Sequence, residues 1–271
     1  MSTTRDSLRQ TLDALLQPER FKDYGPNGLQ VEGKSDIRRI VSGVTASRAL
    51  IDAAIAQQAD AIFVHHGLFW RGQDGRVTGW MKQRLQRLLA HDINLFAYHL
   101  PLDAHSELGN NARLGQELGW QADARFGEQD LGCVASVHYD SAEALSRHVE
   151  QVLGRRATLV QPEGGRRIAR VAWCSGGAQG YFEAAIAAGA DAFVTGEISE
   201  PQAHLAREMG VAFIAAGHHA TERYGAPAVA AHVAALHGLE HRFINKKNTS
   251  VSPSRLRISV SLWLRVCVYQ V

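Results

Sequence analysis

The sequence predicts an α/β protein made of two similar βαβ-containing domains in one subunit, and two observations support this fold class. An ungapped internal repeat aligns residues 39–64 with residues 170–195. In both copies a short β-branched run, an Ala-rich stretch of helix length and a second apolar run follow one another. Strand, helix and strand in this order form a unit whose two strands run parallel. Chance similarity between two Ala-rich segments is the alternative explanation.

The N-terminal segment, residues 1–21, has the pattern of an amphipathic helix and lacks the apolar core of a secretory signal. No run in the chain reaches the roughly 18 apolar residues that a membrane-spanning helix needs. We therefore expect a cytoplasmic protein with no membrane partner.

Composition limits the classes of function. A length of 271 residues suits one large or two modest domains, and a hydrophobic content of 45% is ample for a core. Lys and Arg number 29 against 27 for Asp and Glu, so net charge gives no reason to expect nucleic acid as a partner. The three cysteines lie far apart with no CxxC, which argues against thiolate-bound zinc. Any metal ion would therefore bind to histidines, of which there are thirteen, and to carboxylates.

The predicted strand that closes the first βαβ unit ends in His65 and His66. Neighbouring side chains on an extended strand point to opposite faces. Both imidazoles can therefore approach one place only where the strand ends, and the conformational freedom of Gly67 favours an end at this point. Two adjacent histidines at a turn would serve two neighbouring metal ions that share a bridging carboxylate. The alternative for each histidine alone is a hydrogen-bonded structural role.

The next apolar run, residues 95–98, ends at His99, and Asp103 follows four residues later. Asp103 has an alternative role as the cap of a helix beginning near Ser106. The segment 109–114, GNNARL, predicts a turn that leads into a helix, and its alternative role is a hydrogen-bonding wall for a substrate. Three further side chains near these residues would either line a substrate pocket or belong to the core: Trp70, Tyr98 and Asn110.

The second half repeats this arrangement. The apolar run 213–216 leads to His218, and Glu222 follows four residues later. Glu222 has an alternative role as a first-turn carboxylate stabilised by the helix dipole. The sequence Thr195-Gly196-Glu197 occupies the repeat position of the His65-His66 pair, which makes Glu197 a further residue that can face the same cleft.

Ligands bind at the carboxyl edge of open α/β sheets, where all these residues are predicted to lie. Imidazole and carboxylate are the ligands of a Zn, Mn, Fe or Ni site that uses no sulfur. The candidate ligands are His65, His66, His99, Asp103, His218 and Glu222.

Four motifs resemble one known family. VHHGLFW, YHLPLDAHSELGNNARL, TGEIS and AGHHATERYG occur in the order found in the GTP cyclohydrolase I type 2 homologues, also called Nif-three-like dinuclear metal centre hexameric proteins. The similarity covers roughly residues 3–244. The resemblance implies two similar α/β domains, a toroidal homohexamer, and two divalent metal ions per subunit in the cleft between the domains.

Carried over by motif, the resemblance implies that His65 and Asp103 bind one metal ion and that His66 and His218 bind the other. Glu222 would bridge the two ions. His99 would lie beside them as a catalytic proton carrier or as an extra ligand.

The function that follows is a dinuclear metal-dependent hydrolase of this family that acts on a small molecule. Two ions about 3.5–4 Å apart supply a hydroxide and polarise an electrophile. This chemistry suits ring opening of GTP at C8, and it suits hydrolysis of a phosphoester or of a cyclic amide equally well. The alternative is a non-enzymatic, metal-binding hexameric adaptor or regulatory protein.

The predicted domain limits are 1–125 and 126–244, with the alternative that the final strand folds back onto the first half. Residues 245–271 form a tail unlike the family, and a shifted reading frame near Asn245 would account for it. The tail alternates apolar and other residues and predicts an amphipathic strand to which we assign no function.

Overall fold

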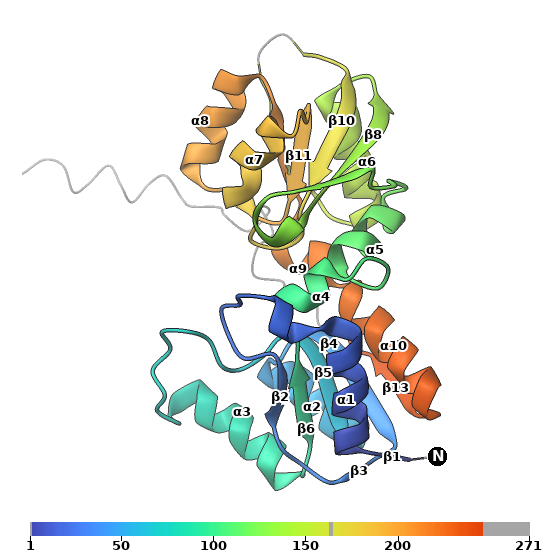
Figure 1. Cartoon of the computed structure of the whole chain (residues 1–271). Helices are drawn as coiled ribbons and strands as arrows, with labels where there is room; N and C mark the ends of the chain where they lie inside the picture. The colour runs from blue at the N-terminus through green and yellow to red at the C-terminus, as the bar shows by residue number, and fades with distance from the viewer. Residues whose placement is uncertain (1, 163–164, 246–271) are drawn as a thin grey trace, which may run out of the picture.

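The computed structural model describes residues 2–162 and 165–245, and within them the chain forms two lobes (Figure 1). The strand expected over residues 256–268 lies outside the described residues. Each lobe contains one main sheet, and short helices lie between the lobes. The predicted α/β fold with two βαβ-containing units is confirmed.

The first lobe contains a five-stranded sheet. Its strands, in spatial order, are β13 (Glu240–Phe243), β4 (Arg39–Thr45), β5 (Ala61–His66), β6 (Asn94–Ala97) and β2 (Gly28–Val31). The first four run parallel, and β2 pairs antiparallel with β6 at the edge. A separate antiparallel pair is formed by β1 (Thr3–Thr4) and β3 (Asp36–Ile37).

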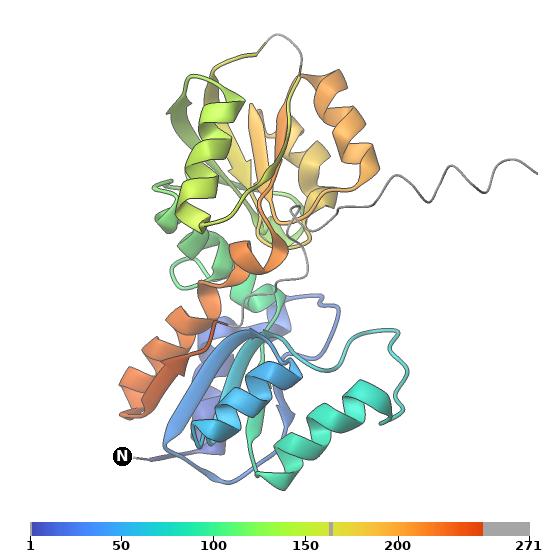
Figure 2. The ribbon, with the colours of Figure 1, turned by 180° about the vertical axis from the view of Figure 1, so that it is seen from behind.

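Helices cover both faces of this sheet, as Figure 2 shows from behind. One face packs against α1 (Arg5–Leu16) and α10 (Gly225–His237). The other packs against α2 (Arg48–Ala56) and α3 (Gly79–Ala90). The predicted amphipathic N-terminal helix is α1, which begins at the cap residue Thr4 and buries Leu8, Leu12 and Leu16.

The second lobe contains a six-stranded sheet. Its strands, in spatial order, are β7 (Ala124–Phe126), β8 (Gly132–Tyr139), β10 (Ile168–Trp173), β11 (Ala192–Thr195), β12 (Ala212–Ala215) and β9 (Thr158–Val160). The central three strands run parallel, and the others pair antiparallel. One face packs against α6 (Ala142–Leu153) and α5 (Asn110–Glu117), and the other against α7 (Phe182–Ala187) and α8 (Glu200–Met209).

The internal repeat extends to strand register. In the first lobe Ile40 of β4 lies opposite Ala61 of β5, and in the second lobe Val171 of β10 lies opposite Ala192 of β11. These are equivalent positions of the repeat, 39–64 aligned with 170–195. The βαβ units therefore match strand for strand, which places the carboxyl edges of both sheets in equivalent positions.

The chain crosses between the lobes twice. It leaves the first lobe through α4 (Leu100–Ala104) and α5, and it returns through α9 (His218–Glu222) and α10. The returning segment ends in β13, which pairs with β4 of the first sheet. The second lobe is thus an insertion between α5 and α10, and residues 225–243 belong with the first sheet.

Three 3₁₀ helices complete the described elements, η1 (Pro18–Arg20), η2 (Glu128–Asp130) and η3 (Gln179–Tyr181). Over the described ranges, none of the helices has both the length and the apolarity to cross a bilayer.

Candidate metal centre

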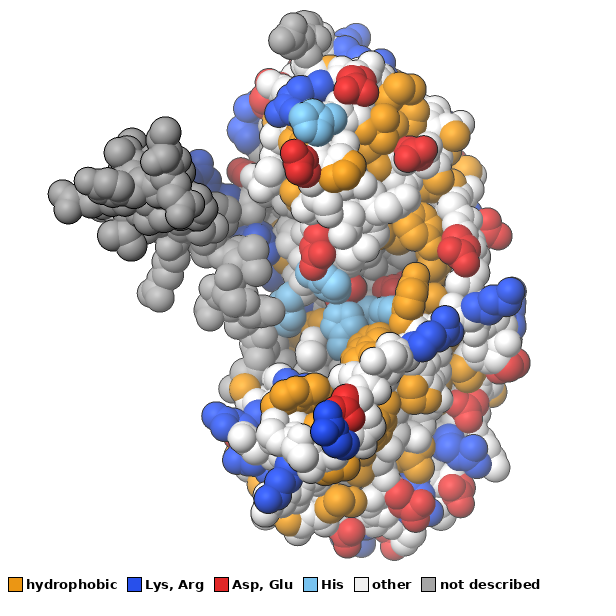
Figure 3. All heavy atoms as spheres, turned by 90° about the vertical axis from the view of Figure 1, so that its left-hand side faces the viewer, with side chains coloured by type: hydrophobic (Ala, Val, Ile, Leu, Met, Phe, Trp, Pro, Cys, Tyr) orange, Lys and Arg blue, Asp and Glu red, His pale blue; other side chains and the backbone are white. Residues whose placement is uncertain are grey.

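The residues predicted to bind metal come together between the lobes. His65 and His66 end β5, Asp103 lies in α4 after β6, and His218 and Glu222 open and close α9 after β12. Figure 3 shows histidine side chains gathered in a hollow between the two lobes. Exposure rises across the cluster, from 0% for the side chain of His65 and 4% for that of Glu222 to 37% for that of His218. The centre therefore has a buried floor and an open side.

Two adjacent histidines approach one carboxylate because β5 ends at His66. Their ring centroids are 4.4 Å apart. Nε2 of His65 lies 3.4 Å from Oε1 of Glu222, and Nε2 of His66 lies 3.4 Å from Oε2. Gly67 follows the strand, and an added Cβ there would displace the amide end of Gln30, whose Oε1 accepts a hydrogen bond from the Leu68 backbone N–H at 2.7 Å. The pair thus faces both oxygens of one buried carboxylate.

The separations between these atoms match those of ligands around one ion. Ligand atoms about 2.1 Å from a tetrahedral ion lie about 3.4 Å from one another. Glu222 Oε1 lies 3.1 Å from His218 Nε2, and Asp103 Oδ1 lies 3.6 Å from His65 Nε2. Hydrogen bonds between such groups are usually 2.7–3.2 Å long. Most of these distances therefore suit a shared cation better than direct hydrogen bonding.

Within the described residues, three groups offer ligand atoms that all lie within 4.8 Å of one another and could hold a metal ion. These groups are His65 with Asp103 and Glu222, His66 with His218 and Glu222, and His65 with His66 and His99. Glu222 belongs to the first two.

Two buried atoms of the cluster, His65 Nε2 and Glu222 Oε2, have no hydrogen-bond partner among the described residues. Buried polar atoms are costly when unpaired. Divalent cations bound to these atoms would satisfy both, so the residues present fit metal ions.

Each histidine ring has its second nitrogen held by a neighbour. Nδ1 of His65 lies 3.2 Å from the carbonyl oxygen of Tyr98, and Nδ1 of His66 lies 3.0 Å from Thr45 Oγ1. Nδ1 of His218 lies 2.7 Å from Glu197 Oε1. Such contacts orient a metal-binding imidazole, and the two pure acceptors, the Tyr98 carbonyl and the Glu197 carboxylate, favour the tautomer that leaves Nε2 free. Glu197 thus faces the cleft, as its repeat position suggested, and supports His218.

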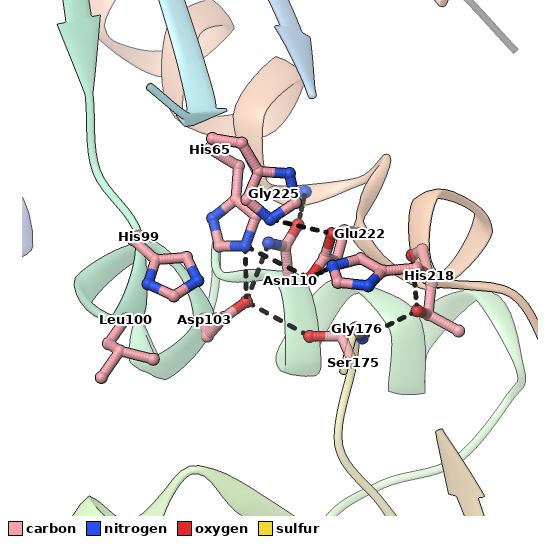
Figure 4. Close-up of polar contacts among 12 residues, drawn as sticks. His65, His99, Leu100, Asp103, Asn110, Ser175, Gly176, His218, Glu222 and Gly225 are labelled. Atoms are coloured by element: carbon pink, nitrogen blue, oxygen red, sulfur yellow. Dashed lines mark hydrogen bonds and ion pairs between the residues drawn. The ribbon is translucent and has the colours of Figure 1, made fainter. Parts of the chain in front are cut away.

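Asp103 is fixed by hydrogen bonds on the buried side of the centre (Figure 4). Its Oδ1 accepts hydrogen bonds from Asn110 Nδ2 at 2.9 Å and from Ser175 Oγ at 3.2 Å. The alternative role of Asp103 as the cap of the next helix is wrong. That helix, α5, begins at Asn110, and its cap residue is Gly109, which has no side chain to cap it. The first-turn role of Glu222 is also wrong, because Glu222 is the last residue of α9.

The carboxylates control the charge of the histidines. Burial would lower the pKa of His65, but Asp103 and Glu222 raise it to about 9. Burial likewise opposes protonation of His218, but its contacts with Glu222 and Glu197 raise its pKa to about 9. For His66, burial dominates and the pKa falls to about 3. The centre attracts positive charge, and one of its imidazoles stays neutral and available as a ligand.

Two of the three side chains considered for a substrate pocket belong to the interior. Tyr98 is fully buried and donates a hydrogen bond from its hydroxyl to Asp13 at 2.6 Å. Asn110 is fully buried, and its Oδ1 accepts from the backbone N–H of Gly225 at 2.8 Å. Asn111 is equally buried, so the two asparagines of segment 109–114 are interior residues. Trp70 is half-buried at the open side, with its ring edge-on to His99 at 5.0 Å.

Sequence reasoning missed several supporting residues. Thr45, the last residue of β4, contacts His66, and Ser175, two residues after β10, contacts Asp103. Both lie at the carboxyl end of the first strand of their repeat copy, a position that could have drawn attention to them. Asp23 contacts His99 from a loop 76 residues away in sequence, and no local pattern marks it. Gly176, next to Ser175, has a φ of +71° and closely approaches Glu222.

Substitution of Gly176 by Ala is expected to displace Glu222 and reduce bound metal to less than half of the wild-type content. An added Cβ would collide with Oε1 of Glu222 in a conformation that already disfavours side chains. Metal per chain measured by mass spectrometry checks this. The control is Gly189→Ala, since Gly189 also has positive φ but no neighbour within 4 Å of an added Cβ. Equal metal content in both variants would contradict the expectation.

Residues 3–249 match the family described as Duf34/NIF3 (NGG1p interacting factor 3). A protein of Neisseria meningitidis serogroup A named GTP cyclohydrolase 1 type 2 homolog is 55% identical over 235 residues, which are 86% of this chain and 94% of the relative. A Pseudomonas aeruginosa protein of the same name is 48% identical over 252 residues, 92% of this chain and 99% of the relative.

Solved structures agree with these matches. The protein ybgI, described as of unknown function, has a TM-score of 0.87 at 43% identity and covers 91% of this chain and 99% of its own. TTHA1606 from Thermus thermophilus has a TM-score of 0.80 at 35% identity, with 91% and 100% covered. These comparisons confirm the resemblance drawn from the four motifs, and the chain belongs to the Duf34/NIF3 family.

Proposed function

We propose that the protein is a dinuclear metal-dependent hydrolase. The observation that carries this proposal is that Glu222 belongs to two ligand groups at once, one with His65 and Asp103 and one with His66 and His218. A carboxylate with both oxygens near separate imidazoles is suited to bridge two ions. His and carboxylate ligands fit Zn, Mn, Fe or Ni.

Two divalent ions held by these residues would activate a water molecule for attack near neutral pH and would stabilise charge on the reacting electrophile. The protein residues orient and support this centre. Asp103 and Glu222 provide the negative charge that balances the ions, and His65, His66 and His218 provide neutral nitrogen ligands. His99, beside them, is the proton carrier.

A small-molecule substrate approaches from the open side of the centre. His218 and Glu197 are the most exposed residues there, with side chains 37% and 47% accessible, and Trp70 borders His66 and His99. The relatives' name directs the first choice of substrates to GTP and other nucleotides, with phosphoesters and cyclic amides beside them. A homohexamer and a cytoplasmic location are further parts of this proposal.

Turnover is expected to depend on metal and to fall by about 10³-fold or more in Glu222→Gln, because several kcal/mol of charge stabilisation is lost. The measurement is product formation from nucleotides, phosphoesters and cyclic amides by protein loaded with Mn or Zn. Glu200→Gln is the matched control, since Glu200 is exposed on α8 and contacts only His204 among the described residues. Equal turnover in wild type and Glu222→Gln would refute the proposal.

The alternative, a non-enzymatic adaptor, is favoured by the placement of the ligands on both sides of the lobe boundary. His65 and His66 come from the first sheet, whereas His218 and Glu222 follow β12 of the second. Bound ions would then hold the lobes together. An adaptor is expected to turn over no substrate, and chelation of its metal ions is expected to change its melting temperature or its assembly state. Thermal melting measures the first change and light scattering the second.

A further inference from the structure

His99 differs from the other histidines of the centre in its partner. Its Nδ1 lies 2.7 Å from Oδ1 of Asp23, and the side chain of Asp23 is only 3% exposed. Within the described residues, the ion pairs of His65 and His66 run to Asp103 and Glu222, and His218 pairs with Glu222 as well as with Glu197, whereas His99 pairs with Asp23 alone. His99 therefore pairs with a carboxylate that belongs to neither of the ligand groups that contain Glu222.

Asp23 is held rigidly for this contact. Its second oxygen, Oδ2, accepts hydrogen bonds from the Leu100 backbone N–H and from Asn27 Nδ2, both at 2.9 Å. Asn27 Oδ1 in turn accepts from the backbone N–H of His99 at 2.7 Å. Burial would raise the pKa of Asp23, but the contacts with His99, Asn27 and Leu100 outweigh it and lower the pKa. A loop far away in sequence thus holds an ionised carboxylate against one ring nitrogen.

The contact determines which nitrogen of the neutral ring carries the proton. An ionised carboxylate only accepts hydrogen bonds, so Nδ1 of His99 is the donor and Nε2 keeps its lone pair. The ring lies edge-on to Trp70 at 5.0 Å and 4.9 Å from the ring of His65. Nε2 is therefore the nitrogen available to a reacting molecule beside the centre.

His99 also groups with His65 and His66, but that group contains no carboxylate. Three imidazoles can hold a divalent ion, but each group that includes Glu222 also supplies negative charge. The two groups with Glu222 already account for two ions without His99. The carboxylate-containing groups thus favour His99 as a neighbour of the ions over His99 as a ligand.

We propose that Asp23 is the positioning residue of His99, and that the Asp23–His99 pair lies outside the metal ligand set and moves the proton during hydrolysis. In this step Nε2 takes a proton from the attacking water as its oxygen bonds to the electrophile. The same proton then passes to the leaving group when its bond breaks. The inference rests on the proposed hydrolase function.

Two readouts test the placement without using activity. The Co(II)-loaded protein is expected to keep its metal content and visible absorption spectrum in His99→Gln and in Asp23→Asn. In protein labelled with ¹⁵N-histidine, the signal missing from His99→Gln identifies His99, which is expected to carry its proton on Nδ1 in wild type and on Nε2 in Asp23→Asn. A changed Co(II) spectrum, or an unchanged tautomer in Asp23→Asn, would overturn the proposal.

A third readout tests the role in turnover with bis(4-nitrophenyl) phosphate as probe. Each variant is expected to lose about 10²–10⁴-fold in kcat, as for other misplaced acid–base histidines. The double variant is expected to be no slower than His99→Gln, because the two residues act as a unit. Asp13→Asn is the control, since Asp13 contacts Tyr98 and not His99. Additive losses would overturn the proposal.

The readouts separate this inference from the function on which it rests. If the wild-type protein hydrolyses neither the probe nor the other substrates, the proposed hydrolase function is contradicted. The proposal that the Asp23–His99 pair moves a proton during hydrolysis then fails with it. The Co(II) spectrum and the tautomer of His99 still decide whether Asp23 positions an imidazole outside the ligand set.

Discussion

Replacement of Glu222 by alanine is expected to reduce bound metal from about two ions per chain to less than one. Glu222 is 3% exposed and is the carboxylate that these two ligand groups of the described residues share. Removal of a shared ligand weakens both sites together. Metal content after gentle purification, measured by mass spectrometry beside wild type, checks this result.

The same variant is expected to unfold at lower temperature even after chelation of metal. Three histidines would lose a buried negative partner, and removal of one member of such a buried network costs about 3–5 kcal/mol. Thermal melting with and without EDTA separates the two effects. Glu200→Ala serves as the exposed control on α8. Retention of about two ions by Glu222→Ala would exclude a bridging carboxylate.

Replacement of Asn111 by leucine is expected to destabilise the protein by about 2–5 kcal/mol, because buried groups lose their partners. Asn111 lies at the start of α5 and is fully buried. Its Oδ1 accepts from the Ser175 backbone N–H at 2.7 Å, and its Nδ2 donates to the Leu131 carbonyl at 3.0 Å. Leucine can replace neither bond. Chemical denaturation of the metal-free protein measures the loss.

Gln116→Leu is the control for this prediction, because Gln116 is on the same helix and exposed, and its side chain hydrogen-bonds only to Arg113 among the described residues. A change within about 0.5 kcal/mol is expected there, as for most surface substitutions. Equal unfolding free energies for the two variants would show that the buried amide contributes nothing specific.

Local patterns predicted most of this site because its ligands follow strands of regular design. The repeat aligned Ile40 with Val171, and the same alignment holds in the register of both sheets. His65, His66 and His218 follow apolar runs, so the carboxyl edges of the strands place them between the lobes. Periodicity and strand ends are local properties, and the sequence displays them directly.

Contacts between distant segments left no such pattern. Asp23 reaches His99 across 76 residues, and Asn110 accepts from Gly225 across 115. A Tyr or an Asn among apolar residues can line a pocket or belong to the core, and only the packing decides between the two. The sequence therefore could not assign Tyr98 and Asn110 to either role. The pairing of β13 with β4 was an open alternative for the same reason.

The insertion of one lobe into the other fixes the order in which they can be completed during synthesis on the ribosome. All strands of the second sheet have emerged once residue 215 leaves the exit tunnel. The first sheet must wait for β13, whose Glu240 meets Arg39 across 201 residues. Until then, the face that α10 covers stays exposed and open to wrong contacts. The lobe that is translated first is therefore the lobe that finishes folding last.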